Sequence, residues 1–249
     1  AVAIVAEKGP VEEIVTISNE TELVANFGKP NGSNFEWFFT AASFLKYANV
    51  LRVVRINSGH VNACVSGTAI LIKNSDHWTN TYADGSANIG MWAARTPGTW
   101  GNNLKVWQCP SLTVYEQDLA ANNRVNDGSA AEGDTSITVD DADAANYAIV
   151  VNDIISFTSD AAGATPVTGH EGKEYIVTAV NTSTNTLTFK QHGVFSTKGL
   201  AAAVADNSNI TRRWRWYEEF AGAPGTSTFA ADRGGSGDEM HIMITDEGA

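Results

Sequence analysis

The stretch from Gly9 to Ile56 constrains the fold most, because its local signals follow one another in a consistent order. The β-branched run Val11–Ile17 predicts a short strand. Asn19 then offers a capping oxygen with an acidic residue three positions later, and the Gly-Lys-Pro sequence at residues 28–30 is typical of a helix end. We therefore predict a strand followed by one short helix.

A second helix and a second strand complete this stretch. Ser33 with Glu36 repeats the capping signature and predicts a helix of about four turns. Val50–Ile56 is β-branched again and predicts a strand, on which Arg52 and Arg55 stand where a half-buried strand reaches solvent or a partner. The helix carries a broad apolar face made of Phe35, Phe38, Phe39, Ala42, Leu45 and Tyr47.

The residues around this stretch continue the alternation of strands and loops. Ala1–Ala6 is strand-like, and the apolar run Thr68–Lys73 has the length of a buried strand. Asn74–Asn88 is polar and predicts a loop, whereas apolar and polar residues alternate along a strand from Leu104 to Gln108. These elements place a mixed α/β domain at the start of the chain.

A glycine-rich loop precedes that last strand. Thr96–Asn103 (TPGTWGNN) concentrates turn formers around Trp100. Gly98 and Gly101 are expected at positions of positive φ or of close backbone approach, which a side chain would block. We interpret the loop as a rigid turn closed by the Trp100 side chain, with a ligand-binding loop as the alternative.

The character of the chain changes from Pro110 onward. Residues 110–205 hold 12 acidic and 4 basic residues and none of the seven tryptophans. The NTSTN sequence at residues 181–185 is typical of a hairpin connection. Short strands separated by polar turns are predicted at Ser136–Val139, Asp153–Thr158, Glu174–Val180 and Thr186–Lys190. This pattern predicts a small β-barrel or sandwich with a solvated, acidic surface.

Aromatic and basic residues alternate toward the end of the chain. Leu200–Ala205 is alanine-rich and predicts a helical turn, and Glu239–Thr245 predicts a last strand. Between them, Thr211–Phe220 predicts a strand with tryptophans on one face and cations on the other. Because Arg and Trp are enriched at protein interfaces, the candidate interface residues are Arg52, Arg55, Arg213, Arg215, Trp214 and Trp216.

The predicted fold class is α+β. We expect a discontinuous α/β base domain made of residues 1–112 plus 206–249. Residues 113–205 are expected to form an inserted, acidic, all-β module of barrel or sandwich type on the periphery of that base.

The sequence offers no constellation that predicts catalysis, a metal or a cofactor. The histidines never fall at metal-ligand spacing, and Ser236 lacks the G-x-S-x-G pattern of a nucleophile. The aspartates at 140, 141 and 143 could hold a calcium ion, but the Gly and the distal Glu that a calcium loop requires are absent after them. The net charge of −12 disfavours binding to nucleic acid, and no apolar run reaches the length of a membrane span.

The two cysteines, Cys64 and Cys109, are interpreted as reduced side chains. They are far apart in the sequence, and a chain of this length needs no disulfide. A single bridge between them is the alternative.

Three stretches carry a resemblance to a known family. The sequences "TISNETELVANFGKP" at 16–30 with "FLKYANVLRVVRIN" at 44–57, "RTPGTWGNNLKVW" at 95–107 and "ADRGGSGDEMHIMITDEG" at 231–248 resemble the contractile-tail sheath proteins of myoviruses. Such proteins stack in helical rings around a tail tube and contract to drive it through the host envelope. The resemblance implies a virion protein, assembled in the host cytoplasm, whose partners are other sheath subunits, the tube, the baseplate and the tail terminator.

Sheath proteins normally continue past the last predicted strand into a region that binds the tube. We therefore expect the 249-residue chain alone to be soluble and to form homo-oligomers only as part of a full-length protein. The alternative function is a phage-associated module that binds a receptor or carbohydrate. An enzyme is the third hypothesis. Within the structural hypothesis, the sequence fits pyocin-like sheaths and secretion-system sheaths as well as phage tail sheaths.

Overall fold

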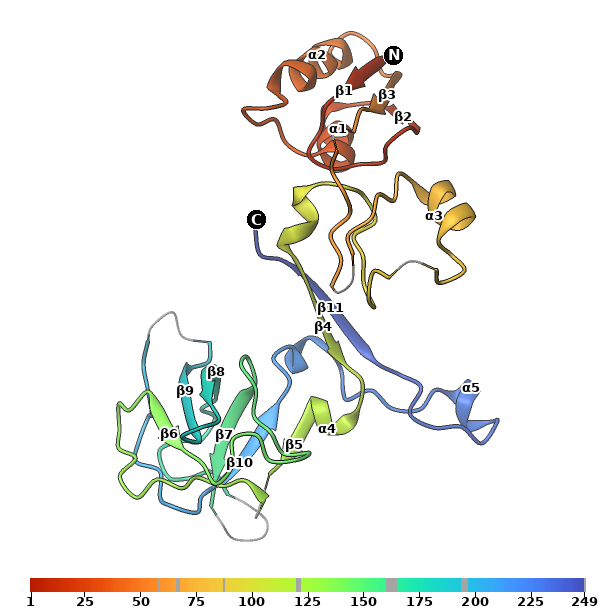
Figure 1. The fold of residues 1–249 in the computed structure, drawn as a ribbon. Helices are drawn as coiled ribbons and strands as arrows, with labels where there is room; N and C mark the ends of the chain where they lie inside the picture. The colour runs from red at the N-terminus through yellow and green to blue at the C-terminus, as the bar shows by residue number, and fades with distance from the viewer. Residues whose placement is uncertain are drawn as a thin grey trace. The chain divides into compact units, whose positions relative to one another are not determined.

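The computed structural model describes residues 1–57, 59–65, 68–86, 88–119, 122–159, 165–193 and 197–248. These residues form two compact units, the first comprising Ala1–Val106 and Ile244–Ala249 and the second Trp107–Met243. The chain passes between the units twice, within strands β4 (Leu104–Cys109) and β11 (His241–Asp246), which pair with each other. Figure 1 shows these two strands as the segments that join the units.

The first unit contains a three-stranded mixed sheet. Its strands are β1 (Val2–Ile4), β2 (Ile14–Ile17) and β3 (Leu51–Arg55), in the order β1-β3-β2. The central strand β3 runs parallel to β1 and antiparallel to β2. The three strands predicted in this part of the chain are therefore confirmed.

Two helices pack against this sheet. The first, α1 (Glu20–Phe27), begins as predicted, because the Asn19 side chain accepts a hydrogen bond of 2.9 Å from the Glu22 amide. The second, α2 (Phe35–Leu45), begins at Asn34 without a side-chain cap, so the predicted Ser33 cap is wrong. The Asn34 side chain instead accepts from the Asn31 amide at 2.7 Å and stabilises the preceding turn. Both helices and all three strands contribute to one core that includes Ile4, Ile17, Leu23, Phe27, Phe38, Leu51 and Val53.

The remainder of the first unit is mostly irregular. The predicted strand Thr68–Lys73 is wrong, because its backbone groups bond to scattered partners such as Val11 and Asn62 and form no ladder. The predicted loop after it contains a short helix, α3 (Ser75–Thr81), whose start the Asn74 side chain caps by accepting from the His77 amide at 2.9 Å. A 3-10 helix, η1 (Thr99–Asn103), leads into β4.

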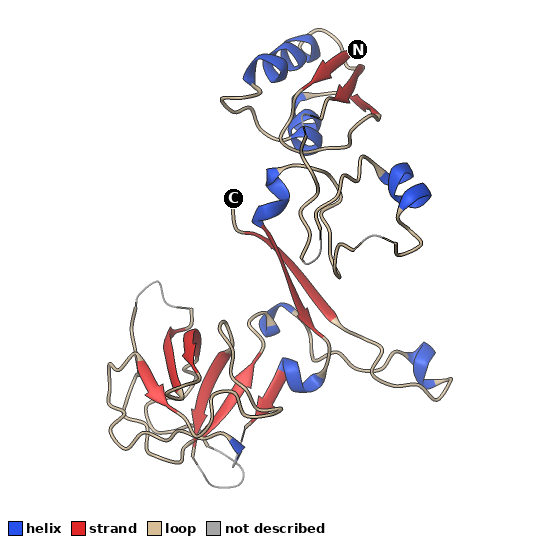
Figure 2. Ribbon diagram, viewed as in Figure 1, coloured by secondary structure: helices blue, strands red, loops and turns tan. Residues whose placement is uncertain are grey.

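The second unit is built on a six-stranded antiparallel sheet in the order β5-β10-β7-β8-β9-β6. Its strands are β5 (Glu116–Asp118), β6 (Ser136–Thr138), β7 (Ile154–Thr158), β8 (Tyr175–Asn181), β9 (Thr186–Gln191) and β10 (Asn209–Arg213). Four of these strands confirm predictions, and β8 and β9 form the predicted hairpin. Over the described residues the sheet does not close into a barrel. Figure 2 shows that strands and long loops dominate this unit.

The second unit also contains three short helices, namely α4 (Leu112–Tyr115), η3 (Tyr217–Glu219) and α5 (Thr228–Ala231), of which α4 contacts β5. The predicted strand Thr211–Phe220 is wrong in its second half, because β10 ends at Arg213 and the chain turns into η3. The predicted helical turn Leu200–Ala205 is also wrong. That segment is irregular, and its Leu200 and Val204 side chains are buried in the core of the unit.

A hydrogen-bonded chain of polar groups crosses the core of the second unit. The His170 ring lies 3.0 Å from the Ala202 carbonyl oxygen through Nε2, and its Nδ1 lies 2.9 Å from the Tyr175 hydroxyl. The same hydroxyl accepts from the Ala201 amide at 3.0 Å. Each buried polar atom of this chain thus has a partner, which makes its burial tolerable.

The class α+β holds in the sense that both units combine helices and strands. The borders of the compact units differ from those of the predicted base domain, residues 1–112 plus 206–249, and the predicted module, 113–205. In the structure, β10 belongs to the same sheet as the predicted module. The predicted division stays a prediction about functional domains.

Candidate assembly surface

Helix α2 turns only part of its apolar surface toward the core of the first unit. Phe38, Ala41 and Ala42 are buried, with exposed fractions of 5%, 1% and 4%. At 3.6 residues per turn these three residues lie along one stripe of the helix. The helix contacts β1 and β3, so this stripe is the part that the sheet covers.

Four aromatic side chains lie on either side of the buried stripe, and we call them the aromatic flanks of α2. They are Phe35, Trp37, Phe39 and Phe44, and their exposed fractions are 48%, 40%, 53% and 45%. The spacing of four between Phe35 and Phe39 puts them on one side, and the spacing of seven between Trp37 and Phe44 puts them on the other.

The predicted apolar face of this helix therefore exists, but the first unit covers only its middle. Phe35 and Phe39 belong to the part left exposed, and Tyr47, just past the helix, is 91% exposed. Exposed aromatic side chains in such numbers are typical of surfaces that contact another protein. The sequence could not predict which of these side chains stay exposed. The spacing of apolar residues shows how wide the apolar face of the helix is, but not how much of that face a neighbouring element covers.

Arg55 is a structural residue inside the first unit. Its side chain is 1% exposed and donates to the carbonyl oxygens of Pro97 at 2.6 Å, Gly9 at 2.7 Å and Ala6 at 3.1 Å. Arg52, three residues earlier, is exposed. Because successive residues of a strand point to opposite faces, Arg55 shares the buried face of Leu51 and Val53 whereas Arg52 does not. Of this predicted pair, only Arg52 is available to a partner.

The loop that receives Arg55 depends on Gly98. This glycine has a φ of +139°, and a Cβ placed on it would lie 2.2 Å from the Glu7 carbonyl oxygen. A Cβ on Gly101 would lie 2.9 Å from the Ala94 Cβ. The predicted close approach at both glycines is confirmed. Trp100 in the same loop is half-buried, and the Lys8 ammonium lies 4.9 Å from the centroid of its ring.

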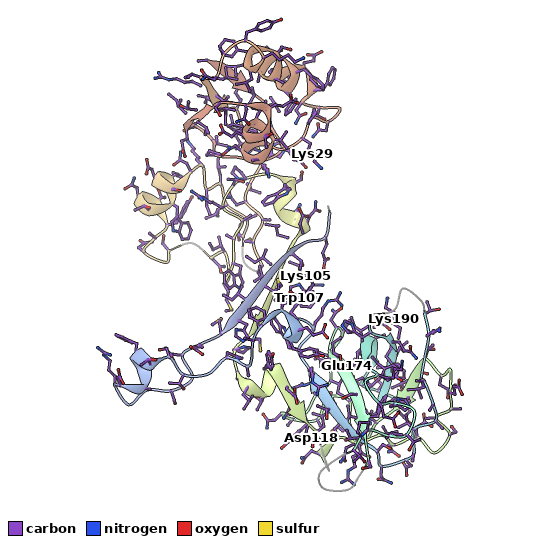
Figure 3. All side chains as sticks on the ribbon, turned by 180° about the vertical axis from the view of Figure 1, so that it is seen from behind. Lys29, Lys105, Trp107, Asp118, Glu174 and Lys190 are labelled. Carbon is purple, nitrogen blue, oxygen red and sulfur yellow. The ribbon has the colours of Figure 1, made fainter. Side chains whose placement is uncertain are left out.

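Arg213 lies in an ionic network of the second unit. Its guanidinium bonds to the Glu116 carboxylate at 2.9 Å and to the Glu174 carboxylate at 2.7 Å. Glu174, labelled in Figure 3, also accepts from the Tyr217 hydroxyl at 2.8 Å. Burial acts to lower the pKa of Arg213, but the two carboxylates outweigh it, so that the pKa is raised. Burial and the Glu174 carboxylate raise the pKa of Tyr217.

Trp214, Arg215 and Trp216 follow β10 and pack within the second unit. Trp214 is 6% exposed, and its ring lies 5.5 Å from that of Phe220. The Arg215 guanidinium lies 5.8 Å from the ring centroid of Trp107 and 5.2 Å from that of Trp216. The expected separation into a tryptophan face and a cationic face does not occur, because the strand ends before these residues.

One buried carboxylate in the second unit has an unusual proton affinity. Asp153 accepts from the Val150 amide at 2.8 Å and lies 4.0 Å from Arg212. Burial raises its pKa to about 6, against the opposing effects of these two partners. No function was predicted for this residue, since burial of an aspartate cannot be read from local sequence.

The cysteines and the acidic loop take structural roles. Cys64 and Cys109 form no disulfide in the structure. Asp140 accepts from the Arg124 amide at 3.0 Å, and Ser236 lies in an exposed loop before β11.

Over the described residues, no group of three His, Cys, Asp or Glu side chains is arranged to hold a metal ion. Within the same residues, no helix has the length and hydropathy needed to cross a bilayer.

Comparison with known proteins identifies the first part of the chain. Residues 1–56 match the family described as "Tail sheath protein Gp18 domain III N-terminal region". This segment belongs to the tail sheath family. It contains β1 to β3, α1 and α2, and therefore the complete set of aromatic flanks.

Three tail sheath proteins resemble the chain. That of Salmonella phage ViI is 38% identical over 106 residues, which are 41% of this chain and 16% of the relative. That of Vibrio phage KVP40 is 48% identical over 50 residues, 20% of this chain and 8% of the relative. That of Enterobacteria phage T4 is 45% identical over 47 residues, 19% of this chain and 7% of the relative. The matches thus span less than a fifth of these tail sheath proteins, and no solved structure matches the chain.

The parts of the three tail-sheath-like stretches that lie in the first unit contact one another. Arg55 bonds to Pro97 in the second stretch, and the Glu247 amide of the third donates to the Asn103 carbonyl oxygen at 2.9 Å. Lys105 and Glu247 form an ion pair of 3.4 Å. Within the first unit the resemblance therefore involves segments that fold together, whereas residues 231–243 of the third stretch belong to the second unit.

Proposed function

We propose that this chain is part of the structural subunit of a contractile phage tail sheath. Such subunits stack in helical rings around the tail tube and contract, which drives the tube through the host envelope. The match of residues 1–56 to the tail sheath family carries the proposal, and the similarity to three phage tail sheath proteins supports it.

The aromatic flanks of α2 are proposed as the surface on which the first unit meets further sheath protein. Helical assemblies need interfaces that join unlike surfaces and propagate without closing. Four aromatic side chains that are 40% to 53% exposed provide apolar area that such contacts would remove from water. The exposed Arg52 is a proposed polar contact of the same unit.

The predicted inserted module, residues 113–205 within the second unit, is proposed to be peripheral and not required for assembly. The core and the open six-stranded sheet of the second unit support this role, and we propose that the module is of sandwich type. The chain passes into and out of the second unit through the paired strands β4 and β11, so a short linker that replaces residues 113–205 would leave both strands and the first unit in place. A full-length protein with this replacement should still assemble.

The proposed role is passive and needs neither catalysis nor a cofactor. Its proposed partners are other sheath subunits, the tail tube, the baseplate and the tail terminator. The proposed location is the tail of the virion, after assembly in the host cytoplasm.

Electron microscopy tests the proposal. The full-length reading frame that contains this sequence should form regular tubes with its tail tube protein, whereas the 249-residue chain alone should not. Phe39→Ser and Phe44→Ser in the full-length protein should reduce tube formation, and Glu36→Gln on the opposite, polar side of α2 should not. Tubes made by the chain alone would contradict the proposed need for a longer protein. Normal tubes from both serine variants would contradict the assembly role of α2.

A further inference from the structure

A hollow of about 420 Å³ lies beside α3 in the first unit. Ser75, Trp78 and Thr79 of α3 line one side, and the segment from Ile89 to Arg95 lines the other. Ile72 and Ile89 are buried, with exposed fractions of 5% and 8%. Concave, mostly apolar hollows of this size are typical of binding sites for small ligands or side chains.

The lining of this hollow combines aromatic walls with a single charge. Trp78 and Trp92 contribute two indole rings, and Met91 is 74% exposed. Arg95 is the sole charged residue that lines the hollow. Its guanidinium bonds to the Ser75 hydroxyl at 3.2 Å, and no carboxylate of the described residues lies within 4.0 Å of it. Several of its five N–H donors are therefore available to a ligand.

A second hollow of about 370 Å³ continues from the same place. It shares Asn74, Ser75 and Arg95 with the first hollow and extends to Lys8 and Trp100. Glu13 also lines it and is the one acidic residue there. We call the two hollows together the Arg95 groove. Two cations and one carboxylate give the groove a positive charge in a chain whose net charge is −12.

We propose that the Arg95 groove binds an extended peptide segment that carries an apolar side chain next to a carboxylate. The apolar side chain would lie between Trp78 and Trp92, and the carboxylate would pair with Arg95. Arginine suits this role because its planar fork binds a carboxylate through two parallel hydrogen bonds. Because both hollows are lined by Asn74, Ser75 and Arg95, a peptide chain that occupies the two together suits the groove better than a compact molecule. The inference does not depend on the tail sheath function.

NMR of the whole 249-residue chain tests this proposal. The probe is an acetylated and amidated Gly-Phe-Asp-Ser peptide, and the matched peptide carries Asn in place of Asp. The readout is the indole N–H signals, assigned by the variants Trp78→Phe and Trp92→Phe. The acidic peptide should shift the signals of both tryptophans, and the Asn peptide should bind about tenfold more weakly, since one charged hydrogen-bonded pair is lost.

Two arginine variants separate the groove from general charge effects. Arg95→Gln should weaken binding of the acidic peptide about tenfold, whereas Arg233→Gln, which changes an exposed arginine outside the groove, should leave binding unchanged. Circular dichroism checks that both variants are folded. The proposal fails if neither indole signal shifts, if the Asp and Asn peptides bind equally, or if Arg95→Gln has no effect. It also fails if an anionic sugar, the methyl glycoside of N-acetylneuraminic acid, shifts these signals and the peptide does not.

Discussion

The Arg55 Nη1 atom lies 2.6 Å from the carbonyl oxygen of Pro97. This hydrogen bond joins the central strand of the first unit to the glycine-rich loop that precedes β4. The same Nη1 donates to the Gly9 carbonyl oxygen at 2.7 Å, so one cation connects three segments that are far apart in the sequence. Burial lowers the pKa of Arg55, and backbone carbonyl oxygens rather than a carboxylate satisfy its donors.

Arg55→Met should destabilise the first unit by about 2–4 kcal/mol, because several buried carbonyl oxygens lose a charged donor. Arg52→Met is the matched control on the same strand, and its effect should stay within about 0.5 kcal/mol because Arg52 is exposed. Urea unfolding followed by tryptophan fluorescence measures both. Equal midpoints for the two variants would show that the Arg55 contacts do not stabilise the unit.

Gly98→Ala should destabilise the first unit by more than about 2 kcal/mol, because it combines a clash with an unfavourable backbone angle. The added Cβ would lie 2.2 Å from the Glu7 carbonyl oxygen. Gly85→Ala separates the two causes, since Gly85 has a φ of +81° but nothing within 4 Å of its Cβ position. That control should lose only about 1 kcal/mol. If thermal unfolding shows the same loss of stability for both variants, the close approach of the Glu7 carbonyl oxygen is not what requires glycine at position 98.

Asp153 should make the second unit less stable as the pH rises from about 4 to about 6. With its pKa raised to about 6, the folded protein holds a proton that the unfolded chain has already released. Relative to Asp153→Asn, the wild type should therefore lose roughly 2–3 kcal/mol of unfolding free energy across this window.

Denaturant unfolding at a series of pH values measures the difference between the two proteins, in which the effects of the other carboxylates cancel. Asp143→Asn, which changes an exposed aspartate, is the control and should follow the wild type. Parallel pH profiles for the wild type and Asp153→Asn would rule out the raised pKa.

Tyr175→Phe should destabilise the second unit by about 1–3 kcal/mol, because it leaves the His170 Nδ1 and the Ala201 amide without their buried partner. Tyr147→Phe is the control, since Tyr147 packs against the same core and no hydrogen bond of its hydroxyl is found among the described residues. Chemical denaturation should therefore give a clearly larger loss for Tyr175→Phe. A similar loss for both variants would show that the polar chain through His170 contributes little.

Local signals predicted most of the regular elements. The Asn19 cap and the β-branched run Val50–Ile56 specified α1 and β3, because capping and strand propensity act over a few residues. The same reasoning failed for Thr68–Lys73, whose apolar residues suit a strand but find no neighbouring strand to pair with. It also extended β10 to Phe220, because local sequence does not show that Trp214 packs against Phe220 and the distant His241 after the strand has ended.

The candidate sites show even more clearly which properties local sequence predicts and which properties the tertiary structure decides. Alternation along β3 already separates Arg52 from Arg55, yet only the fold brings the carbonyl oxygens of Ala6, Gly9 and Pro97 to the arginine that faces inward. The apolar composition of α2 was visible in the sequence, but the sheet had to be placed before Phe39 and Phe44 were seen to be exposed. The sequence by itself thus determined local conformation, since hydrogen bonds and side-chain preferences within a few residues decide it. The tertiary structure alone decided burial and the Arg95 groove, because both depend on contacts between segments that are far apart along the chain.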